Sequence, residues 1–414
     1  MGLVSVVLRT SERLTVRTLP APGPVDLVGR LPHPAALAWI RRDSGLVGWG
    51  EAARVPIPGG PDRFARARGA LTALFEGAEV DDAVGVPGSG PVAFGTFGFD
   101  PKSDDSVLIV PRSVVGWRDG RAWHTVIGAD DDPMAELNPP RQPSGVAWRG
   151  GALDDTGWGG AVRTATGRIR EGELGKVVLA RDLWAEADEP IDARVLLRRL
   201  SARFPDCYTF AVDGLVGATP ELLVRRIGGE IASLVLAGTT PRGADEAADR
   251  ALGEALFASA KDRREHAYAA DMVRDALAPL CAELDLPAEP ELLRLANVQH
   301  LATPVRGRLA GERSVLDVLE ALHPTPAVCG TPTDAAMDLI RELEEMDRSR
   351  YAGPVGWVDS RGDGEWGIAL RCAQLDGRRA RLFAGCGIVA DSDPAAEIAE
   401  ARAKFGVMRT ALDG

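Results

Sequence analysis

The sequence predicts an α/β (α+β) fold in which large, mostly antiparallel sheets are covered by helices. Short apolar runs recur in pairs separated by turn residues, which is the pattern of β-hairpins, and long segments with helical spacing lie between these pairs. Because strands and helices do not alternate one by one, a parallel sheet built from βαβ units is not expected. The chain contains neither a Walker A motif nor a strand followed by G-x-G-x-x-G.

The bulk composition is that of an acidic globular protein. With 414 residues, of which 45% are hydrophobic, the chain is long enough to bury a large core. Its formal net charge of -12 argues against a nucleic-acid-binding or anionic-membrane surface. No apolar stretch reaches the roughly 18 residues of a membrane span, and the five cysteines are scattered and odd in number. We therefore expect a cytoplasmic protein that is a monomer or at most a weak dimer.

The first 150 residues are predicted to form short strands around one helix. The helix is expected at 64–75, where Phe64, Ala67, Leu71 and Phe75 share one face. Strands are expected at 3–8, 35–40, 46–49, 91–99 and 107–110, and a hairpin at 114–127 with its turn at 118–120. The polar, proline-rich stretch 130–143 is interpreted as a loop between two halves.

The remaining residues, 151–414, combine longer helices with further hairpins. Strands are expected at 176–181, 207–212, 215–217, 222–227, 231–237, 295–309, 351–358, 367–374 and 381–384. Helices are expected at 156–171, 195–204, 245–286 in two pieces, 315–322, 333–348 and 394–412. The last of these begins with Ser392 or Asp393 as N-cap and Pro394 at its first position.

Three carboxylate sites are candidates for chemistry. Two are pairs on helices, and the third is Glu221. Gly385-Cys386-Gly387 is a segment where the backbone can pass close to another group. The last helix follows it, and Glu397 and Glu400 lie on one face of that helix. Glu265 and Asp262 share a face of another helix, so two packed helices would let Glu265 and Glu400 hold one Mg²⁺. The alternative is that both are ordinary solvated helix faces.

Glu221 and Lys176 are the candidates for proton transfer. Glu221 follows Pro220 and opens an apolar strand, where burial would raise its pKa and suit it to general-acid work. Lys176 is one of only four lysines in the chain, and a buried lysine with a lowered pKa can act as a base. A surface carboxylate at a strand start and a snorkelling surface lysine are the alternatives.

Arg371 and His300 are candidates for ligand contacts. Arg371 stands among apolar neighbours in Ile-Ala-Leu-Arg-Cys-Ala, and a buried arginine needs an anion such as a substrate carboxylate. A structural ion pair would serve it equally well. His300 in Val-Gln-His-Leu is a core histidine unless it points into a cleft. Spacing therefore predicts a metal-assisted acid–base enzyme that acts on a carboxylate substrate.

Ordered motifs over about 155–412 resemble the chorismate-utilising enzymes, and among them most closely the isochorismate synthases. The matching stretches are 175–181 (Gly-Lys-Val-Val-Leu-Ala-Arg), 218–222, 236–239, 241–243, 261–266, 298–304, 323–332, 351–357, 368–371 and 381–400. The first 150 residues match weakly, chiefly at 90–95. The resemblance implies one large domain of two mostly antiparallel sheets with outer helices, in which 1–150 is the variable N-terminal half and 151–414 the chorismate-binding catalytic region.

The activity implied by the resemblance is Mg²⁺-dependent conversion of chorismate to isochorismate, in which water adds at C2 and the C4 hydroxyl leaves. Lys176 matches the general base that activates the water, and Glu221 matches the acid that protonates the leaving hydroxyl. Glu265 and Glu400 match the metal ligands, with Glu397 and, as a further candidate, Asp262 reaching the ion through water. The remaining implied substrate contacts are Arg371, Tyr351, Gly385 and Gly387 at a carboxylate and Gly238, Thr239 and His300 beside the ring.

Two departures from related families favour a reaction that stops at isochorismate. Salicylate synthases, which go on to eliminate pyruvate, tend to have Thr where this chain has Ala327 and Gly-Ser where it has Ala302-Thr303. Anthranilate synthases typically have Gln in place of Lys176. The alternatives are a salicylate synthase and a catalytically silent chorismate-binding subunit. The resemblance leaves open whether the product feeds menaquinone, siderophore or salicylate biosynthesis.

Overall fold

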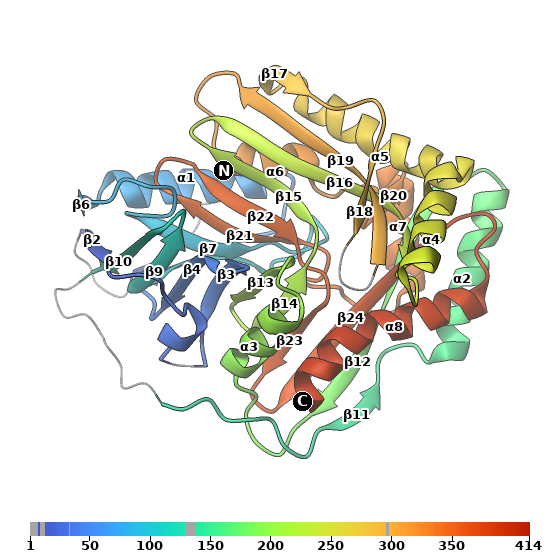
Figure 1. The fold of residues 1–414 in the computed structure, drawn as a ribbon, viewed down its shortest axis with the longest axis horizontal. Coiled ribbons are helices and arrows are strands. Elements are labelled where there is room, and N and C mark those ends of the chain that lie inside the picture. The colour runs from blue at the N-terminus through green and yellow to red at the C-terminus, as the bar shows by residue number, and fades with distance from the viewer. Residues whose placement is uncertain (1–6, 9–12, 33, 129–137, 295–297) are drawn as a thin grey trace.

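The computed structural model describes residues 7–8, 13–32, 34–128, 138–294 and 298–414. Within these ranges the chain forms two large sheets, eight α-helices and one short 3₁₀-helix (Figure 1). Every strand pair is antiparallel except one at the edge of the second sheet. The predicted fold class is therefore confirmed. No helix in the described residues is long and apolar enough to cross a membrane.

The first sheet has 11 described strands and takes them from both halves of the chain. Their order is β1 (Val7–Leu8), β5 (Ala53–Ile57), β8 (Ser106–Val110), β7 (Val92–Thr96), β21 (Pro354–Asp359), β22 (Gly364–Ile368), β15 (Leu222–Ile227), β16 (Glu230–Pro241), β19 (Val298–Leu309) and β17 (Cys281–Asp285), with β18 (Glu291–Arg294) also paired to β19. The two halves meet where β7 pairs with β21, which places Thr96 opposite Val355.

The second sheet has 13 described strands and mixes the halves in the same way. Their order is β11 (Ala147–Gly150), β12 (Lys176–Glu186), β24 (Arg379–Ile388), β23 (Cys372–Asp376), β14 (Leu215–Thr219), β13 (Tyr208–Val212), β3 (Leu37–Arg41), β4 (Ser44–Trp49), β9 (Ser113–Arg118), β10 (Arg121–Ile127), β2 (Thr15–Ala21) and β6 (Glu79–Asp82), with β20 (Gly330–Thr331) paired to β12. Here the halves meet at β3 and β13, where Trp39 lies opposite Phe210.

The helices lie on the outside of the sheets, and the last of them begins at an expected cap. They are η1 (Val28–Arg30), α1 (Arg63–Glu76), α2 (Asp155–Arg170), α3 (Ala193–Arg203), α4 (Glu246–Ala258), α5 (Ala260–Leu277), α6 (Val315–Leu322), α7 (Thr333–Leu343) and α8 (Pro394–Asp413). In α8 the Asp393 side chain accepts a hydrogen bond from the Ala396 N–H, with Pro394 in the first turn. Figure 1 shows α8 lying along β24 and α5 along β16.

Hairpin turns follow the predicted chemistry. Asp119-Gly120 joins β9 to β10, and Asp213-Gly214 joins β13 to β14. All four residues have positive φ, between 49° and 80°, as a two-residue type I′ turn requires. Glycine at the second position adopts this conformation without steric cost, which is why the sequence located these hairpins well.

Three predicted elements differ from the structure. The helical region 245–286 ends at Leu277, and Cys281–Asp285 instead forms edge strand β17, because pairing with β19 outweighs local propensity. The helix predicted at 333–348 ends at Leu343. The single strand predicted at 367–374 is two strands in different sheets, separated by Ala369–Arg371. The expected segments 3–6, 130–137 and 295–297 lie outside the described residues.

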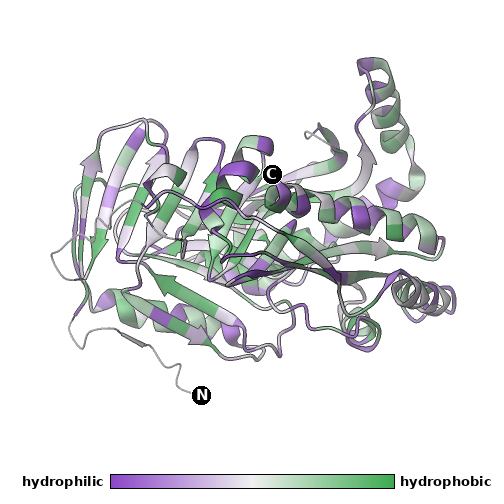
Figure 2. Cartoon of the chain, turned by 90° about the horizontal axis from the view of Figure 1, so that it is seen from below, coloured by the Kyte–Doolittle hydropathy of each residue, from purple (hydrophilic) through white to green (hydrophobic). Residues whose placement is uncertain are grey.

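The core lies between and around the sheets. The Trp39 indole on β3 donates a 2.9 Å hydrogen bond to the Glu365 carboxylate on β22, which links the two sheets. The Trp39, Trp357 and Trp366 side chains are almost entirely buried nearby and supply much of the apolar area that stabilises this contact. Apolar residues are dense along the central strands, whereas polar residues are frequent on the outer helices and loops (Figure 2).

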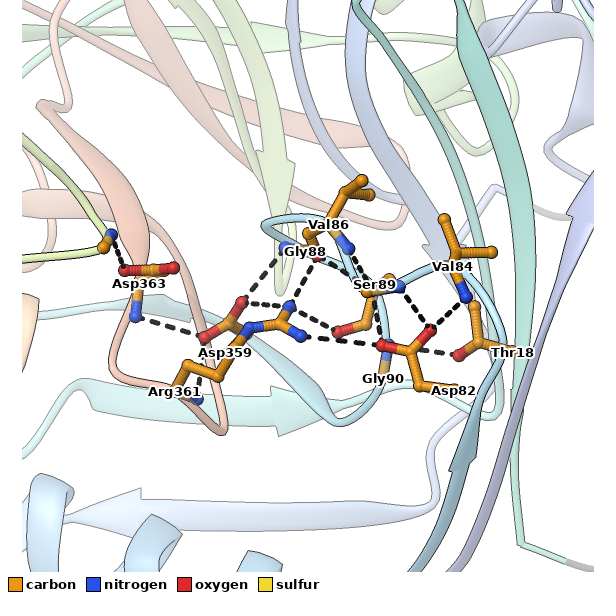
Figure 3. A network of polar contacts seen from close by, with 12 residues as sticks. Thr18, Asp82, Val84, Val86, Gly88, Ser89, Gly90, Asp359, Arg361 and Asp363 are labelled. Carbon is orange, nitrogen blue, oxygen red and sulfur yellow. Dashed lines mark hydrogen bonds and ion pairs between the residues drawn. The ribbon is translucent and has the colours of Figure 1, made fainter.

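A buried polar network ties the loop at 82–90 to the β21–β22 hairpin (Figure 3). The Asp359 carboxylate accepts hydrogen bonds from the backbone N–H groups of Gly88, Arg361 and Asp363 and from the Arg361 guanidinium. Arg361 also donates to the Ser89 carbonyl oxygen at 3.0 Å. Each charge in this network therefore has several partners, as buried ionic groups require.

Candidate active site

A cavity of about 140 Å³ lies where the chain crosses from one sheet to the other. Its wall comes from β16 and β19 of the first sheet, β12 and β24 of the second, and α8. The β14–β15 turn, the β22–β23 link and the loops after α6 and α7 complete it. It brings together eight of the predicted site residues, which are Glu221, Thr239, His300, Ala327, Tyr351, Arg371, Gly385 and Gly387. These residues are up to 166 positions apart in sequence (from Glu221 to Gly387), so only the tertiary fold assembles them.

Arg371 occupies the link between β22 and β23. Its φ of 48° is in the left-handed region, which is unusual for a residue other than glycine, and its carbonyl oxygen accepts from the Ala218 N–H at 3.2 Å. Among the described residues no carboxylate forms an ion pair with the Arg371 guanidinium, which lines the cavity. A guanidinium that lines a cavity and forms no ion pair there is suited to a carboxylate ligand.

Glu221 stands at the turn between β14 and β15. Its N–H donates to Thr219 Oγ1 at 3.2 Å and its carbonyl oxygen accepts from the Ile368 N–H at 3.1 Å, so the backbone is held on both sides. Burial raises the pKa of the Glu221 carboxyl to about 7, although Arg371 and Lys176 oppose this rise. A carboxyl group that keeps a proton near neutral pH can act as a general acid.

Lys176, the first residue of β12, reaches toward the same cavity. A Cβ atom built at Gly387 would come within 2.9 Å of the Lys176 Cε, so the lysine side chain lies against this glycine of the cavity wall. Burial lowers the pKa of Lys176, and the nearby Lys404 adds to this effect, whereas Glu265, Glu221 and Glu400 oppose it. A lowered pKa increases the fraction of neutral amine that can accept a proton.

Gly385 and Gly387 are required for space. Neither residue has a positive φ. Glycine is therefore present at these positions because other groups approach the backbone closely, and not because the backbone conformation is unusual. A Cβ at Gly385 would lie 3.1 Å from the Tyr351 hydroxyl. Tyr351 is held by stacking on Phe383, with ring centroids 5.1 Å apart, and burial raises the pKa of its hydroxyl, which therefore stays protonated.

A β-bulge shapes the opposite wall. Gly238, with φ of 78°, is the extra residue in β16, and the register resumes with Thr239 opposite His300. The Thr239 Oγ1 and His300 Nδ1 atoms are 2.9 Å apart. Burial lowers the pKa of His300 to about 4, to which Arg371 contributes. The imidazole is therefore neutral at physiological pH and offers a hydrogen bond without a charge.

The acidic group at the start of α8 has the donors of a cation site. Within the described residues, Cys386 Sγ and carboxylate oxygens of Glu397 and Glu400 all lie within 4.8 Å of one another. The Ser392 hydroxyl donates to Glu397 at 2.8 Å. Glu265 is not part of this group, but it lies close enough to Lys176 to raise the lysine pKa. Oxygen donors of this kind fit Mg²⁺, whereas a thiol does not.

Two cationic residues of the cavity wall were not predicted. Lys404 Nζ lies 2.5 Å from Glu400 Oε1 and donates to the Gly385 carbonyl oxygen at 2.7 Å. The rarity of lysine and its place four residues after Glu400 could have singled it out. Arg348, paired with the buried Glu344, donates to the Val178 and Val328 carbonyl oxygens. No local pattern indicates this role, because the three contacts join distant segments.

An amine, a carboxyl group and an unpaired arginine around one small cavity are typical of an enzyme that moves protons on a small anion. The chain belongs to the family described as chorismate binding enzyme, whose model matches residues 120–413. Among curated relatives, isochorismate synthase MenF of Bacillus subtilis is 38% identical over 357 residues, which cover 78% of this chain and 75% of the relative. The salicylate biosynthesis isochorismate synthase of Pseudomonas aeruginosa is 38% identical over 413 residues, which cover 91% and 84%.

Among solved structures, MenF, the menaquinone-specific isochorismate synthase from Escherichia coli, is similar over nearly the whole chain. The TM-score is 0.82 at 27% identity, and the match covers 96% of this chain and 94% of that one. Because this match covers 96% of the chain, it includes most of the described part of the N-terminal half, which resembled the family only weakly in sequence.

Proposed function

We propose that this protein is an isochorismate synthase that converts chorismate to isochorismate and depends on Mg²⁺. The observation that carries the proposal is the pairing of Lys176 and Glu221, each close enough to alter the pKa of the other, beside a cavity with an unpaired arginine. The names of the curated relatives and of the solved structure support the same reaction.

Lys176 and Glu221 would divide the proton transfers. Lys176, with its lowered pKa, accepts a proton from the water that adds at C2 of the ring. Glu221, with its raised pKa, gives a proton to the C4 hydroxyl as it leaves. Burial shifts the pKa of Lys176 down and that of Glu221 up, and both shifts favour the uncharged forms that accept and donate the proton.

The remaining residues would bind and orient the substrate. Arg371 offers a planar pair of donors to one carboxylate, and the Tyr351 hydroxyl lies close to Gly385 on the same wall. His300, kept neutral and paired with Thr239, borders the ring. Gly238 gives Thr239 its position through the bulge. Ala327, a small side chain in the wall, leaves room for the ring.

The acidic group would hold the metal ion. Glu400 of this group and Glu265, which lies outside it and is proposed from the resemblance, are the proposed direct ligands, and Glu397 is proposed to contact the ion through water. When bound, Mg²⁺ would neutralise a substrate carboxylate and fix its position. Lys404, which contacts both Glu400 and the cavity backbone, would add positive charge at the same end.

The direct test is to incubate the purified protein with chorismate and MgCl₂ and to separate the products by chromatography. We expect isochorismate in equilibrium with chorismate, loss of turnover with EDTA, and recovery on adding Mg²⁺. Glu221→Gln, which keeps the shape but not the acid, is the control for contaminating activity. Salicylate and pyruvate as main products, or no consumption of chorismate, would contradict the proposal.

A further inference from the structure

A second and much smaller void, of about 20 Å³, also borders Glu221. Glu221, Leu236 and Ala327 line both spaces and therefore form the wall between them. The rest of the void is lined by apolar side chains of β15, β16 and α5, together with Ser233 and Thr325. A space of this size can hold one water molecule if at least two polar groups are available to it.

Thr325 brings an unused hydroxyl to this void. The residue is 5% exposed, and its Oγ1 has no hydrogen-bond partner within the part of the chain that the structure describes. Its backbone is fixed, because the carbonyl oxygen accepts from the N–H groups of Val328 and Cys329 at 3.1 and 3.0 Å. An unsatisfied buried hydroxyl is destabilising, and an apolar residue of the same shape would avoid this cost.

The Glu221 carboxyl is the complementary group. No side-chain or backbone hydrogen bond to it is present among the described residues. Burial raises its pKa, and the charges of Arg371 and Lys176 oppose this rise. We propose that Thr325 is a positioning residue for Glu221, and that its hydroxyl donates, through one water held in the void, to the carboxyl oxygen turned away from the substrate. This inference rests on the proposed role of Glu221.

The bridge would have two consequences. It would hold the carboxyl in one orientation, so that its other oxygen faces the cavity and presents the proton to the leaving group. It would also favour the ionised carboxylate, because a donated hydrogen bond stabilises the charged form more than the neutral one. The pKa of Glu221 would then be lower than burial alone would make it. The bridge would therefore ease release of the proton during turnover.

The other groups facing Glu221 all lie on the cavity side. They are Lys176, Arg348, Arg371, His300, Tyr351 and Lys404. On the void side, the described lining residues other than Glu221 itself carry no titratable group. A change at Thr325 therefore alters the hydrogen bonding of the carboxyl without changing the number of charges around it.

The test measures the protonation of Glu221 directly, without relying on turnover. The carboxylic acid band in infrared spectra is followed with pH, and the Glu221 contribution is the difference between each protein and its Glu221→Gln version. Thr325→Val removes the hydroxyl and keeps the shape, Thr325→Ser keeps the hydroxyl, and Thr325→Ala is a second hydroxyl-free variant. Thr96→Val is the matched control, because Thr96 Oγ1 is equally buried and unpartnered but lines neither space.

We expect Thr325→Val and Thr325→Ala to move the midpoint up by about one pH unit, whereas Thr325→Ser and Thr96→Val leave it in place. Turnover of chorismate should fall about tenfold in kcat for Thr325→Val, with KM changed less than twofold, and return with Thr325→Ser. An unchanged midpoint in both hydroxyl-free variants, or an equal shift in Thr96→Val, would overturn the inference. If the wild type makes no isochorismate, the proposed function fails but the midpoints still decide this inference.

Discussion

The network around Asp359 and the cavity around Glu221 use the same residue types in opposite ways. Asp359 accepts hydrogen bonds from three backbone N–H groups and from Arg361. Glu221 and Arg371 share a cavity, yet neither makes a side-chain hydrogen bond or ion pair among the described residues. The Asp359 network therefore stabilises the fold. The Glu221 carboxyl and the Arg371 guanidinium instead line a cavity without a hydrogen-bond partner among the described residues, so both are available to a ligand.

The largest expected effect is on turnover, in the cavity. Lys176→Ala and Glu221→Ala should each lower kcat by about 10² or more, with little change in the melting temperature, because neither side chain makes a stabilising hydrogen bond in the described structure. Steady-state kinetics and thermal unfolding measure the two quantities on the same samples. Lys102→Ala, at an exposed lysine, is the control, and near-wild-type kcat in either cavity variant would remove that residue from the mechanism.

The reverse pattern is expected in the network. Asp359→Ala should lower the free energy of unfolding by about 3 kcal/mol, because it leaves three N–H groups and a guanidinium without their acceptor. Urea unfolding measures this loss, and kcat of the folded protein should stay within about twofold. Asp206→Ala, which removes an exposed ion pair with Arg42, should cost about 0–1 kcal/mol. An equal cost for both variants would contradict the distinction.

The smallest expected effect concerns His300. Because burial lowers its pKa to about 4, the imidazolium form should appear only as the pH falls through that value, and the ring should stay neutral from pH 5 to 8. Imidazole ¹⁵N chemical shifts, assigned by comparison with His300→Gln, measure this titration. A midpoint near the ordinary value of about 6.5 would mean that His300 is well solvated and does not border a dry cavity.

Local patterns located most elements but not the break at Arg371. Hairpin turns such as Asp213-Gly214 were predicted correctly because their conformation depends on two residues. The segment 367–374 was interpreted as one strand, since its apolar residues run on without a turn signal. Its division between two sheets depends on partners as far away as Gly217 and Leu222, which no local window contains.

For the same reason, the sequence indicated some residues of the candidate site and not others. Glu221, Lys176 and Arg371 attracted notice through unusual local settings, and the resemblance to a family supplied Tyr351 and Gly238. Arg348 and the small void beside Thr325 went unnoticed, because their significance lies in contacts between segments far apart in sequence. The shared ion at Glu265 and Glu400 remains a prediction.

The sequence by itself determined the hairpins, the helix caps, the acidic composition and the ordered motifs, because each depends on neighbouring residues or on their count. The tertiary structure alone decided that Glu221 loses most of its contact with water, that Arg371 has no ion-pair partner among the described residues, and that Thr325 and Glu221 line one small void. Burial and the presence of a partner are properties of the space around a group, and that space is created only when distant strands come together.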